Sequence, residues 1–303
     1  MSKIADSLAF FAMASFWALN YPLVKFVYDY QSPLSLLFFR ILFATIFSFI
    51  FFWKGIKFPR DLKTNLSIMF FGFINIVFFM GFWFVGESTE SSSLSSIIIY
   101  TYPVISIVLS AIFLKEKLTF LRALGTILGF AGMILIFIEQ LYIKPGIGLF
   151  FLIAGATSWA LGTVYFKKYL LHVGNFTVNS LQFLYTLPFV FLFDLGTGAI
   201  NFAAINLEFL AIVIYMGSLS TSVAYYIYLH LYSKYSVSSI SSYFFAVPAL
   251  SIVFGYFLIP SEVTTLFTYF GFGLISVGIY MSSRGYISTK RRAANQAVAD
   301  TNK

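Results

Sequence analysis

The chain has 303 residues, of which 60% are hydrophobic, 21% aromatic and 10% charged. Soluble domains carry about 25% charged residues, so this composition cannot supply a water-facing surface and indicates that lipid is the solvent. There is no Cys, which excludes disulfides, thiolate metal sites and cysteine nucleophiles, and His172 and His230 have no ligand-like spacing. The net charge of +8 is compatible with nucleic-acid binding, but a membrane topology accounts for it better.

Ten segments are apolar and long enough to cross a bilayer, which takes roughly 20 residues. In chain order they are residues 6–27, 34–53, 65–86, 92–114, 120–138, 146–166, 174–195, 207–230, 236–258 and 264–283. The connections are short and contain turn residues such as Pro33, Pro59 and Gly174. The first segment is interpreted as a permanent helix, because its apolar stretch is too short for a signal peptide. We therefore predict an all-α integral membrane protein with ten transmembrane helices.

The distribution of Lys and Arg predicts the orientation of these helices. With the N-terminus inside, 16 of the 19 basic residues lie on the cytoplasmic face. The exceptions are Lys25 and Lys144, which lie outside, and Arg40, which lies within a helix. Both termini are therefore predicted to be cytoplasmic, in a protein of the cytoplasmic (inner or plasma) membrane. The basic cluster at residues 290–292 is assigned this orienting role, with nucleic-acid or anionic-lipid binding as alternatives.

The sequence contains an internal repeat. Offsets of 142 to 146 residues align Trp17 with Trp159, Arg40 with Gln182, Gly72 with Gly217, Pro103 with Pro248, Gly125 with Gly271 and Gly132 with Gly278. Each half holds five helices, an odd number, so the second half must enter the membrane from the opposite side. We predict two inverted five-helix repeats, residues 1–142 and 143–286, followed by a disordered basic tail at 287–303. Many secondary transporters that work by alternating access have this arrangement.

Several short motifs resemble a known family. Both Trp-Ala-Leu tripeptides, at residues 17–19 and 159–161, precede a lysine, Lys25 or Lys167. The other motifs are Phe39-Arg40-Ile41-Leu42, Tyr102-Pro103-Val104 and Leu114-Lys115-Glu116-Lys117-Leu118-Thr119. Together they resemble the EamA-type members of the drug/metabolite transporter superfamily over about residues 8–283, although residues 258–262 depart from the usual Gly-Glu-rich turn. The resemblance implies a ten-helix carrier of small metabolites, often amino acids or their relatives, and frequently an exporter.

Arg40 is the most informative single residue. It lies about 10 Å inside the outer end of its helix, where a charge costs about 2.5–3.5 kcal/mol. A structural role is favoured, either snorkelling to the outer headgroups or capping helix carbonyls, because the family that the chain resembles shares this Arg across dissimilar substrates. Contact with a substrate carboxylate or phosphate is the alternative.

Segments 92–114 and 236–258 are predicted to line a pathway, because Pro103 and Pro248 free backbone carbonyls within the membrane. A polar or aromatic face precedes each proline, with Ser93, Ser96 and Tyr100 in the first segment and Ser238, Ser241 and Phe245 in the second. Helix packing through small residues is the alternative. The remaining candidates for the pocket are Trp17, Asn20, Asn75, Phe79, Trp159, Gln182, Tyr225 and Tyr243. As a set they predict an aromatic-lined pocket with a few hydrogen-bonding groups.

Acidic residues are expected near helix ends, as with Glu139, Asp194 and Glu208, and not deep within the membrane. Proton relays use buried carboxylates, so uniport or facilitated export is favoured over proton exchange. No nucleotide-binding loop or catalytic cluster is found, so neither an enzyme nor a cofactor is expected. The glycines of segments 120–138 and 264–283 predict close packing, either within one protomer or in a homodimer.

The leading hypothesis is a secondary transporter of small metabolites, with amino acids as the first choice of substrate. A nucleotide-sugar or sugar-phosphate exchanger and a proton-coupled drug exchanger are alternatives within transport. A membrane scaffold or an integral enzyme is the alternative from another class. The expected partners are a small-molecule substrate and the lipid bilayer, and no nucleic acid.

Overall fold

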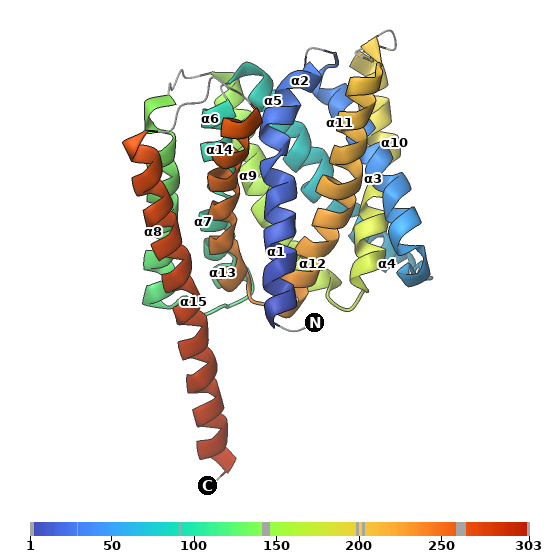
Figure 1. Ribbon diagram of the computed structural model, residues 1–303. Coiled ribbons are helices and arrows are strands. Elements are labelled where there is room, and N and C mark those ends of the chain that lie inside the picture. The colour runs from blue at the N-terminus through green and yellow to red at the C-terminus, as the bar shows by residue number, and fades with distance from the viewer. Residues whose placement is uncertain are drawn as a thin grey trace.

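The structure is a computed structural model that describes residues 3–28, 30–90, 92–140, 146–197, 200–201, 204–258 and 265–301. Within these ranges the regular elements are all helices, which stand side by side as a bundle of upright rods (Figure 1). Eight helical stretches are long and apolar enough to cross a membrane, and two shorter apolar helices, Ile4–Ala18 and Phe120–Ile136, accompany them. The prediction of an all-α membrane protein is confirmed, while the crossing of the bilayer by all ten rods remains a prediction.

The helices follow the ten predicted segments in order. The first half contains α1 (Lys3–Ala18), α2 (Asn20–Tyr28), α3 (Pro33–Phe52), α4 (Leu62–Gly72), α5 (Phe79–Thr89), α6 (Ser92–Ile99), α7 (Tyr102–Phe113) and α8 (Phe120–Ile136). The second half contains α9 (Ile147–Tyr165), α10 (Asn175–Thr197), α11 (Leu207–Gly217), α12 (Ala224–Lys234), α13 (Val237–Ile240), α14 (Ala246–Leu258) and α15 (Leu266–Thr301).

Polar side chains at the loop ends start several of these helices. Ser32 accepts a hydrogen bond from the backbone N–H of Ser35, with Pro33 in the first turn of α3. Asp61 accepts one from Thr64 at the start of α4, and Asn206 accepts one from Phe209 at the start of α11. These side chains satisfy donors that the first turn of a helix leaves unpaired.

Besides the break between α1 and α2, four rods are interrupted near their middle. A π-helical turn, η2 (Phe73–Phe78), joins α4 to α5, and a second, η6 (Ser218–Val223), joins α11 to α12. The rod of α6 and α7 breaks just before Pro103, and a 3₁₀ segment, η7 (Ser241–Phe245), precedes α14 and Pro248. Proline cannot donate to the helix ladder and π turns leave it irregular, so the bundle departs from regular helix at matching depths in both halves.

Glycines bring helix backbones into contact. A Cβ atom added to Gly125 of α8 would lie 2.5 Å from the carbonyl oxygen of Gly278 on α15, and one added to Gly132 would lie 2.7 Å from that of Gly271. The glycines of these two segments therefore pack α8 on α15 within one protomer. Gly72 and Gly217 pack in the same way: a Cβ on Gly72 would lie 2.9 Å from the oxygen of Gln182 and one on Gly217 would lie 3.0 Å from that of Arg40.

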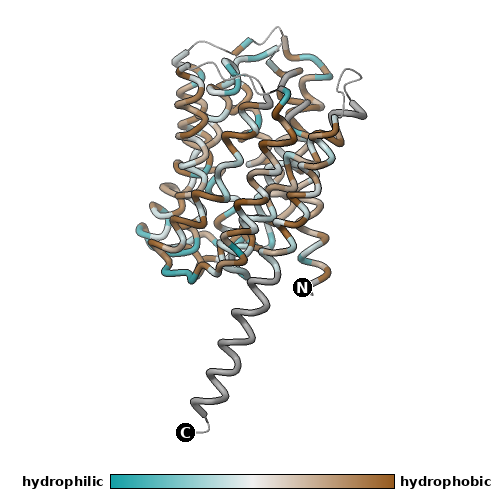
Figure 2. The backbone as a smooth tube through the Cα atoms, turned by 90° about the vertical axis from the view of Figure 1, so that its left-hand side faces the viewer, coloured by the Kyte–Doolittle hydropathy of each residue, from teal (hydrophilic) through white to brown (hydrophobic). Residues whose placement is uncertain are grey.

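Hydrophobic residues cover the length of the rods, and hydrophilic residues gather toward the connecting loops (Figure 2). Large apolar side chains such as Phe150, Leu192 and Phe270 are at least 60% exposed, which fits a surface in contact with lipid. Both ends of the chain emerge on the same side of the bundle (Figure 1). There α15 continues as a helix as far as Thr301, through most of the tail predicted to be disordered. Ala, which recurs in this stretch, is the best helix former, and Lys, Arg and Gln are good ones.

The glycine contact predicts a selective loss of stability. Gly278→Leu would push α15 away from α8, and overpacking of this kind costs about 1–3 kcal/mol. Gly273 lies on the same helix with no atom within 4 Å of an added Cβ, so Gly273→Leu is the matched control. Thermal unfolding in detergent should show a lower midpoint for Gly278→Leu only. Equal midpoints for the two variants would contradict the packing.

Candidate functional site

A narrow cavity lies among α1, α2, α3, α5, α6, α9 and α12. It is lined by Trp17, Asn20, Arg40, Phe79, Met80, Trp83, Ile99, Tyr100, Trp159 and Tyr225. The centre of a water molecule can occupy a volume of about 20 Å³ in this cavity, which is room for about one water. Six of the lining side chains are aromatic, and Arg40 is the charged one among the described residues that line it. The site is therefore closed, with aromatic walls and one fixed positive charge.

Seven of the predicted site residues line this cavity: Trp17, Asn20, Arg40, Phe79, Tyr100, Trp159 and Tyr225. Sequence reasoning missed Met80, Trp83 and Ile99, which also line it. Of these three, Trp83 carried a signal, because it lies one helical turn after Phe79 on the same face. The other predicted residues are placed elsewhere, as described below.

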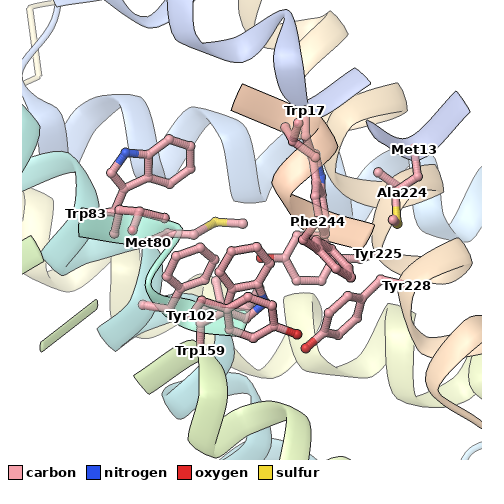
Figure 3. Packing of buried hydrophobic residues seen from close by; sticks show 14 of the residues in the cluster. Met13, Trp17, Met80, Trp83, Tyr102, Trp159, Ala224, Tyr225, Tyr228 and Phe244 are labelled. Atoms are coloured by element: carbon pink, nitrogen blue, oxygen red, sulfur yellow. The ribbon is translucent and has the colours of Figure 1, made fainter. Parts of the chain in front are cut away.

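Aromatic rings stack around Trp159, one of the residues that line the cavity (Figure 3). The ring of Tyr102 is parallel to Trp159 at a centroid distance of 3.8 Å, and that of Phe79 is parallel to it at 4.6 Å. Trp17, its partner in the repeat, meets Trp159 edge-on at 5.5 Å. Aromatic pairs in these geometries contribute about 0.5–1.5 kcal/mol each beyond their buried area. The two repeat-related tryptophans thus meet at the cavity, one from each half of the chain.

Arg40 points into the bundle and not toward the headgroups. Its side chain is 1% exposed, and its Nε donates a hydrogen bond of 2.7 Å to Oγ1 of Thr221 in η6. Its Cζ lies 5.9 Å from the ring centre of Trp83 and 5.6 Å from that of Phe84. The snorkelling expected from the sequence is therefore not observed. The guanidinium is instead fixed beside two aromatic rings, where it faces the cavity.

The two repeat-related tryptophans have different hydrogen bonds. The indole N–H of Trp17 donates to the carbonyl oxygen of Ser220 at 2.9 Å, and the Ser220 hydroxyl donates to Oδ1 of Asn20 at 2.8 Å. The indole N–H of Trp159 is buried and has no acceptor in the described part of the chain. The N–H of Trp17 is thus tied to the protein, while that of Trp159, which also lines the cavity, has no acceptor among the described residues.

Asn75 and Gln182 bond to each other and do not reach the cavity. The Asn75 amide donates to Oε1 of Gln182 at 2.9 Å, and both side chains are fully buried. Asn179, one turn before Gln182 on α10, donates to the carbonyl oxygen of Ser222 at 2.9 Å. These contacts join both π-helical turns, η2 and η6, to α10. Their role is to satisfy polar groups that the apolar interior would otherwise leave unpaired.

The predicted residues on the proline-containing helices lie beside the cavity. Phe245 packs on α8, where a Cβ added to Gly129 would overlap its ring, and Tyr243 meets Phe10 edge-on at 5.7 Å. Pro103 and Pro248 lie in the first turn of α7 and α14. The side chain of Ser93 falls outside the described residues. Part of the predicted polar face is nevertheless used, because Ser106 donates to Ser241 across the two halves at 2.8 Å.

Ser106 and Ser241 belong to a layer of hydrogen-bonded hydroxyls, which we call the hydroxyl layer. Its members are Tyr102, Ser106, Thr163, Tyr228, Tyr232 and Ser241. The Tyr102 and Tyr232 oxygens are 2.7 Å apart, and Tyr232 and Ser241 are 3.0 Å apart. On α12, Tyr228 and Tyr232 lie one and two turns beyond the cavity residue Tyr225, toward the side of the chain termini. The layer therefore closes the cavity on that side.

Ionic contacts lie beyond the hydroxyl layer, at the end of the bundle near the termini. Asp6 of α1 forms an ion pair with Lys234 of α12 and accepts a hydrogen bond from Tyr235 at 2.6 Å. Glu116 accepts hydrogen bonds from the backbone N–H groups of residues 237 and 238, at 2.9 and 3.0 Å. These contacts join the first half of the chain to the second and reinforce the closure.

The EamA-like transporter family matches the chain in two stretches, residues 4–138 and 146–284. The chain belongs to this family. It is therefore a membrane transporter and not an enzyme. The expectation drawn from the Trp-Ala-Leu, Phe-Arg-Ile-Leu and Tyr-Pro-Val motifs is confirmed.

Relatives over the full length are also transporters by name. An uncharacterized transporter of Archaeoglobus fulgidus is 28% identical over 272 residues, which cover 89% of this chain and 95% of the relative. The uncharacterized transporter YvbV of Bacillus subtilis is 28% identical over 309 residues, covering 100% and 97%. A solved crystal structure superposes with a TM-score of 0.79 over 93% of this chain and 97% of its own, at 16% identity, which shows a shared fold.

Three carboxylates among the described residues are buried, which the sequence did not predict. Asp6 is 4% exposed, Glu87 5% and Asp194 0%, and Asp194 accepts a hydrogen bond of 2.8 Å from the Ser35 hydroxyl. All three lie near helix ends, as expected, but the side chains turn inward between helices. The argument against proton exchange assumed that such groups are absent, so it loses its premise.

The contact between Asn75 and Gln182 predicts energetic coupling. Asn75→Ala, Gln182→Ala and the double variant form a cycle, and interhelical hydrogen bonds in membrane proteins average about 0.6 kcal/mol and reach about 1.7 kcal/mol. We expect a coupling within this range in the free energy of unfolding in mixed detergents. The control cycle combines Gln182→Ala with Ser276→Ala. Ser276 is exposed and bonds to the preceding turn of its own helix, so the effects of these two substitutions on the free energy of unfolding should add. Additivity in both cycles would show that the contact contributes nothing.

Proposed function

We propose that this transporter is a secondary carrier that moves small metabolites, with amino acids and related compounds as first candidates, by alternating access. The observation that carries the proposal is a closed cavity walled by both halves of the chain and separated from one end by the hydroxyl layer. A fixed pore would leave this path open. A carrier instead opens its site to one side at a time.

Reciprocal contacts support the inverted repeat on which alternating access depends. Gly125 packs on Gly278 and Gly132 on Gly271, although the repeat equates Gly125 with Gly271 and Gly132 with Gly278. Exchanged pairs of this kind are what a two-fold axis between two equivalent halves generates. Gly72 on Gln182 and Gly217 on Arg40 form a second exchanged set.

Two further observations support the same repeat. The π-helical turns η2 and η6 begin at residues 73 and 218, and the difference of 145 equals the repeat offset of those helices. The family also matches each half separately, over residues 4–138 and 146–284. We therefore keep residues 1–142 and 143–286 as the two repeats, with both termini on the cytoplasmic side.

The proposed gates differ at the two ends of the cavity. Toward the termini the hydroxyl layer joins Tyr102 and Ser106 of the first half to Tyr232 and Ser241 of the second. At the other end, Tyr28 donates to the carbonyl oxygen of Phe84 at 3.1 Å, both within the first half. Tyr28 also borders a surface recess of about 370 Å³. Separation of the hydroxyl layer would open the cavity to the side of the termini, and withdrawal of Tyr28 would open it to the recess.

The cavity fits a small metabolite better than a nucleotide sugar. A nucleoside diphosphate carries at least two negative charges, and Arg40 alone is charged among the described residues that line the cavity. Export, which the family resemblance implies, is the proposed direction. Substrate moving down its own gradient is the simplest mode. Asp6, Glu87 and Asp194 are the buried groups available if a proton moves as well.

Labelling a cavity residue tests alternating access without knowledge of the substrate. The chain has no Cys, so Met80→Cys places a single thiol in the cavity wall. We expect a membrane-impermeant maleimide to label it slowly from either side, in right-side-out and in inside-out vesicles. A scaffold with a permanently closed core would leave the thiol unlabelled from both sides.

The control for this labelling is a lock on the hydroxyl layer. Ser106→Cys with Ser241→Cys would join α7 to η7, because the native hydroxyls are 2.8 Å apart. After oxidation, Met80→Cys labelling from the side of the termini should fall at least about tenfold, with labelling from the other side retained, and dithiothreitol should restore it. Loss of labelling from both sides would contradict separate gates.

Topology is tested by single thiols at exposed positions. Lys57→Cys and Lys117→Cys should react from the same, cytoplasmic side, and Ser88→Cys from the opposite side, because an odd number of helices separates residue 57 from residue 88. Labelling in the two vesicle orientations reads this out directly. Reaction of Lys57→Cys and Lys117→Cys from different sides would remove the inverted repeat and the carrier proposal together.

A further inference from the structure

We propose that the cavity recognises a carboxylate on its substrate through the guanidinium of Arg40 and the indole N–H of Trp159, and takes organic acids with an aromatic or apolar body. This inference rests on the proposed function, since it assigns a substrate class to the same cavity. It does not depend on the direction of transport or on its coupling.

The charge of the cavity favours an anion. Arg40 is 1% exposed, and the described residues that line the cavity include no Asp or Glu. In a low-dielectric site a fixed cation attracts an anion and repels a second cation far more strongly than in water. A planar guanidinium also matches the two oxygens of a carboxylate. Because Thr221 holds Nε, the plane of this group is set before a ligand arrives.

Trp159 supplies a second donor. Its ring is 2% exposed and lines the cavity, and its N–H has no acceptor in the described part of the chain. A buried donor without an acceptor costs free energy, and a ligand oxygen in the cavity would recover it. In the first half of the chain Trp17 already donates to Ser220, so the two tryptophans differ in whether the indole N–H has an acceptor. This difference identifies Trp159, and not Trp17, as the tryptophan that binds the carboxylate.

The aromatic walls select the rest of the ligand. Trp17, Phe79, Trp83 and Tyr225 offer ring faces and edges suited to an aromatic or branched apolar group. Such rings can also attract an ammonium group, but Arg40 lies in the same wall and opposes it. A substrate therefore needs the carboxylate, and an ammonium group is tolerated but adds no affinity.

The cavity must widen to admit such a ligand, because it now has room for about one water. The contacts that can separate are the hydroxyl layer on one side and the bond from Tyr28 to Phe84 on the other. Binding is thus coupled to the opening of a gate. This is what a carrier requires of its substrate.

Three probes with the same phenylethyl skeleton separate the two charges. 3-Phenylpropionate has the carboxylate only, phenylalanine has both groups and phenethylamine has the ammonium only. We expect calorimetric titration of the purified protein to give dissociation constants for 3-phenylpropionate and phenylalanine at least tenfold below that of phenethylamine. Equal or tighter binding of phenethylamine would overturn the proposal. So would the absence of 3-phenylpropionate binding up to about 10 mM, a concentration that covers weak transporter sites.

Two variants test the named atoms. Trp159→Phe keeps the stacked ring and removes only the N–H, and it should weaken 3-phenylpropionate binding about tenfold while leaving phenethylamine unchanged. Arg40→Gln should abolish the preference for the carboxylate. The exposed pair Trp53→Phe and Arg60→Gln are the matched controls, with wild-type binding expected. If Arg40→Gln does not fold, Trp159→Phe decides alone: wild-type affinity for 3-phenylpropionate in that variant would overturn the role of the indole.

The labelling of Met80→Cys separates this inference from the proposed function, because it uses no ligand. Labelling from both sides with no preference for the carboxylate would reject the substrate class and leave the carrier in place. Labelling from neither side would reject the carrier, whatever the probes do.

Discussion

The structure depends on the need of every buried polar group to find its partner inside the protein, because lipid offers none. In this bundle many of those partners come from the other half of the chain. Trp17 donates to Ser220, Arg40 to Thr221 and Asn75 to Gln182. Each contact joins a helix of one half to a helix or π turn of the other. The demand for hydrogen bonds thus holds the halves together around the cavity, while the glycine contacts set how closely they approach.

The two halves that the predicted repeat equates share glycine contacts and π-helical turns but differ in side-chain chemistry. Gly72 and Gly217 meet the backbone of repeat-related residues, but one of these is Gln182, which bonds to Asn75, and the other is Arg40, which faces the cavity. Trp17 and Trp159 differ in the same way, because the N–H of Trp17 is bonded and that of Trp159 has no acceptor among the described residues. In the proposed carrier, the two equivalent backbones would move against each other, and side-chain asymmetry would provide a single polar site between them. One site could then serve both sides of the membrane.

The sequence predicted what depends on local pattern. Apart from the C-terminal end of α15, apolar runs placed the helix ends to within a few residues, and Pro103 and Pro248 marked the breaks before α7 and α14. Which polar groups pair is a tertiary property, so Asn75 and Gln182 were expected at the pocket but bond to each other. The burial of Asp6 was missed for the same reason, because Lys234 and Tyr235 are more than 200 residues away in the chain.

The chemistry of the hydroxyl layer suits a gate. Hydrogen bonds between neutral groups in membrane proteins contribute about 0.6 kcal/mol on average, so the few that join the two halves here amount to about 2 kcal/mol. An interdigitated apolar layer of the same area would cost more to separate, and a set of buried ion pairs would leave charges unpaired on opening. Hydroxyls exchange their partners for water when the layer parts. The hydroxyl layer itself therefore adds little to the free-energy difference between the closed and open states, which a ligand in the cavity has to shift in the proposed carrier.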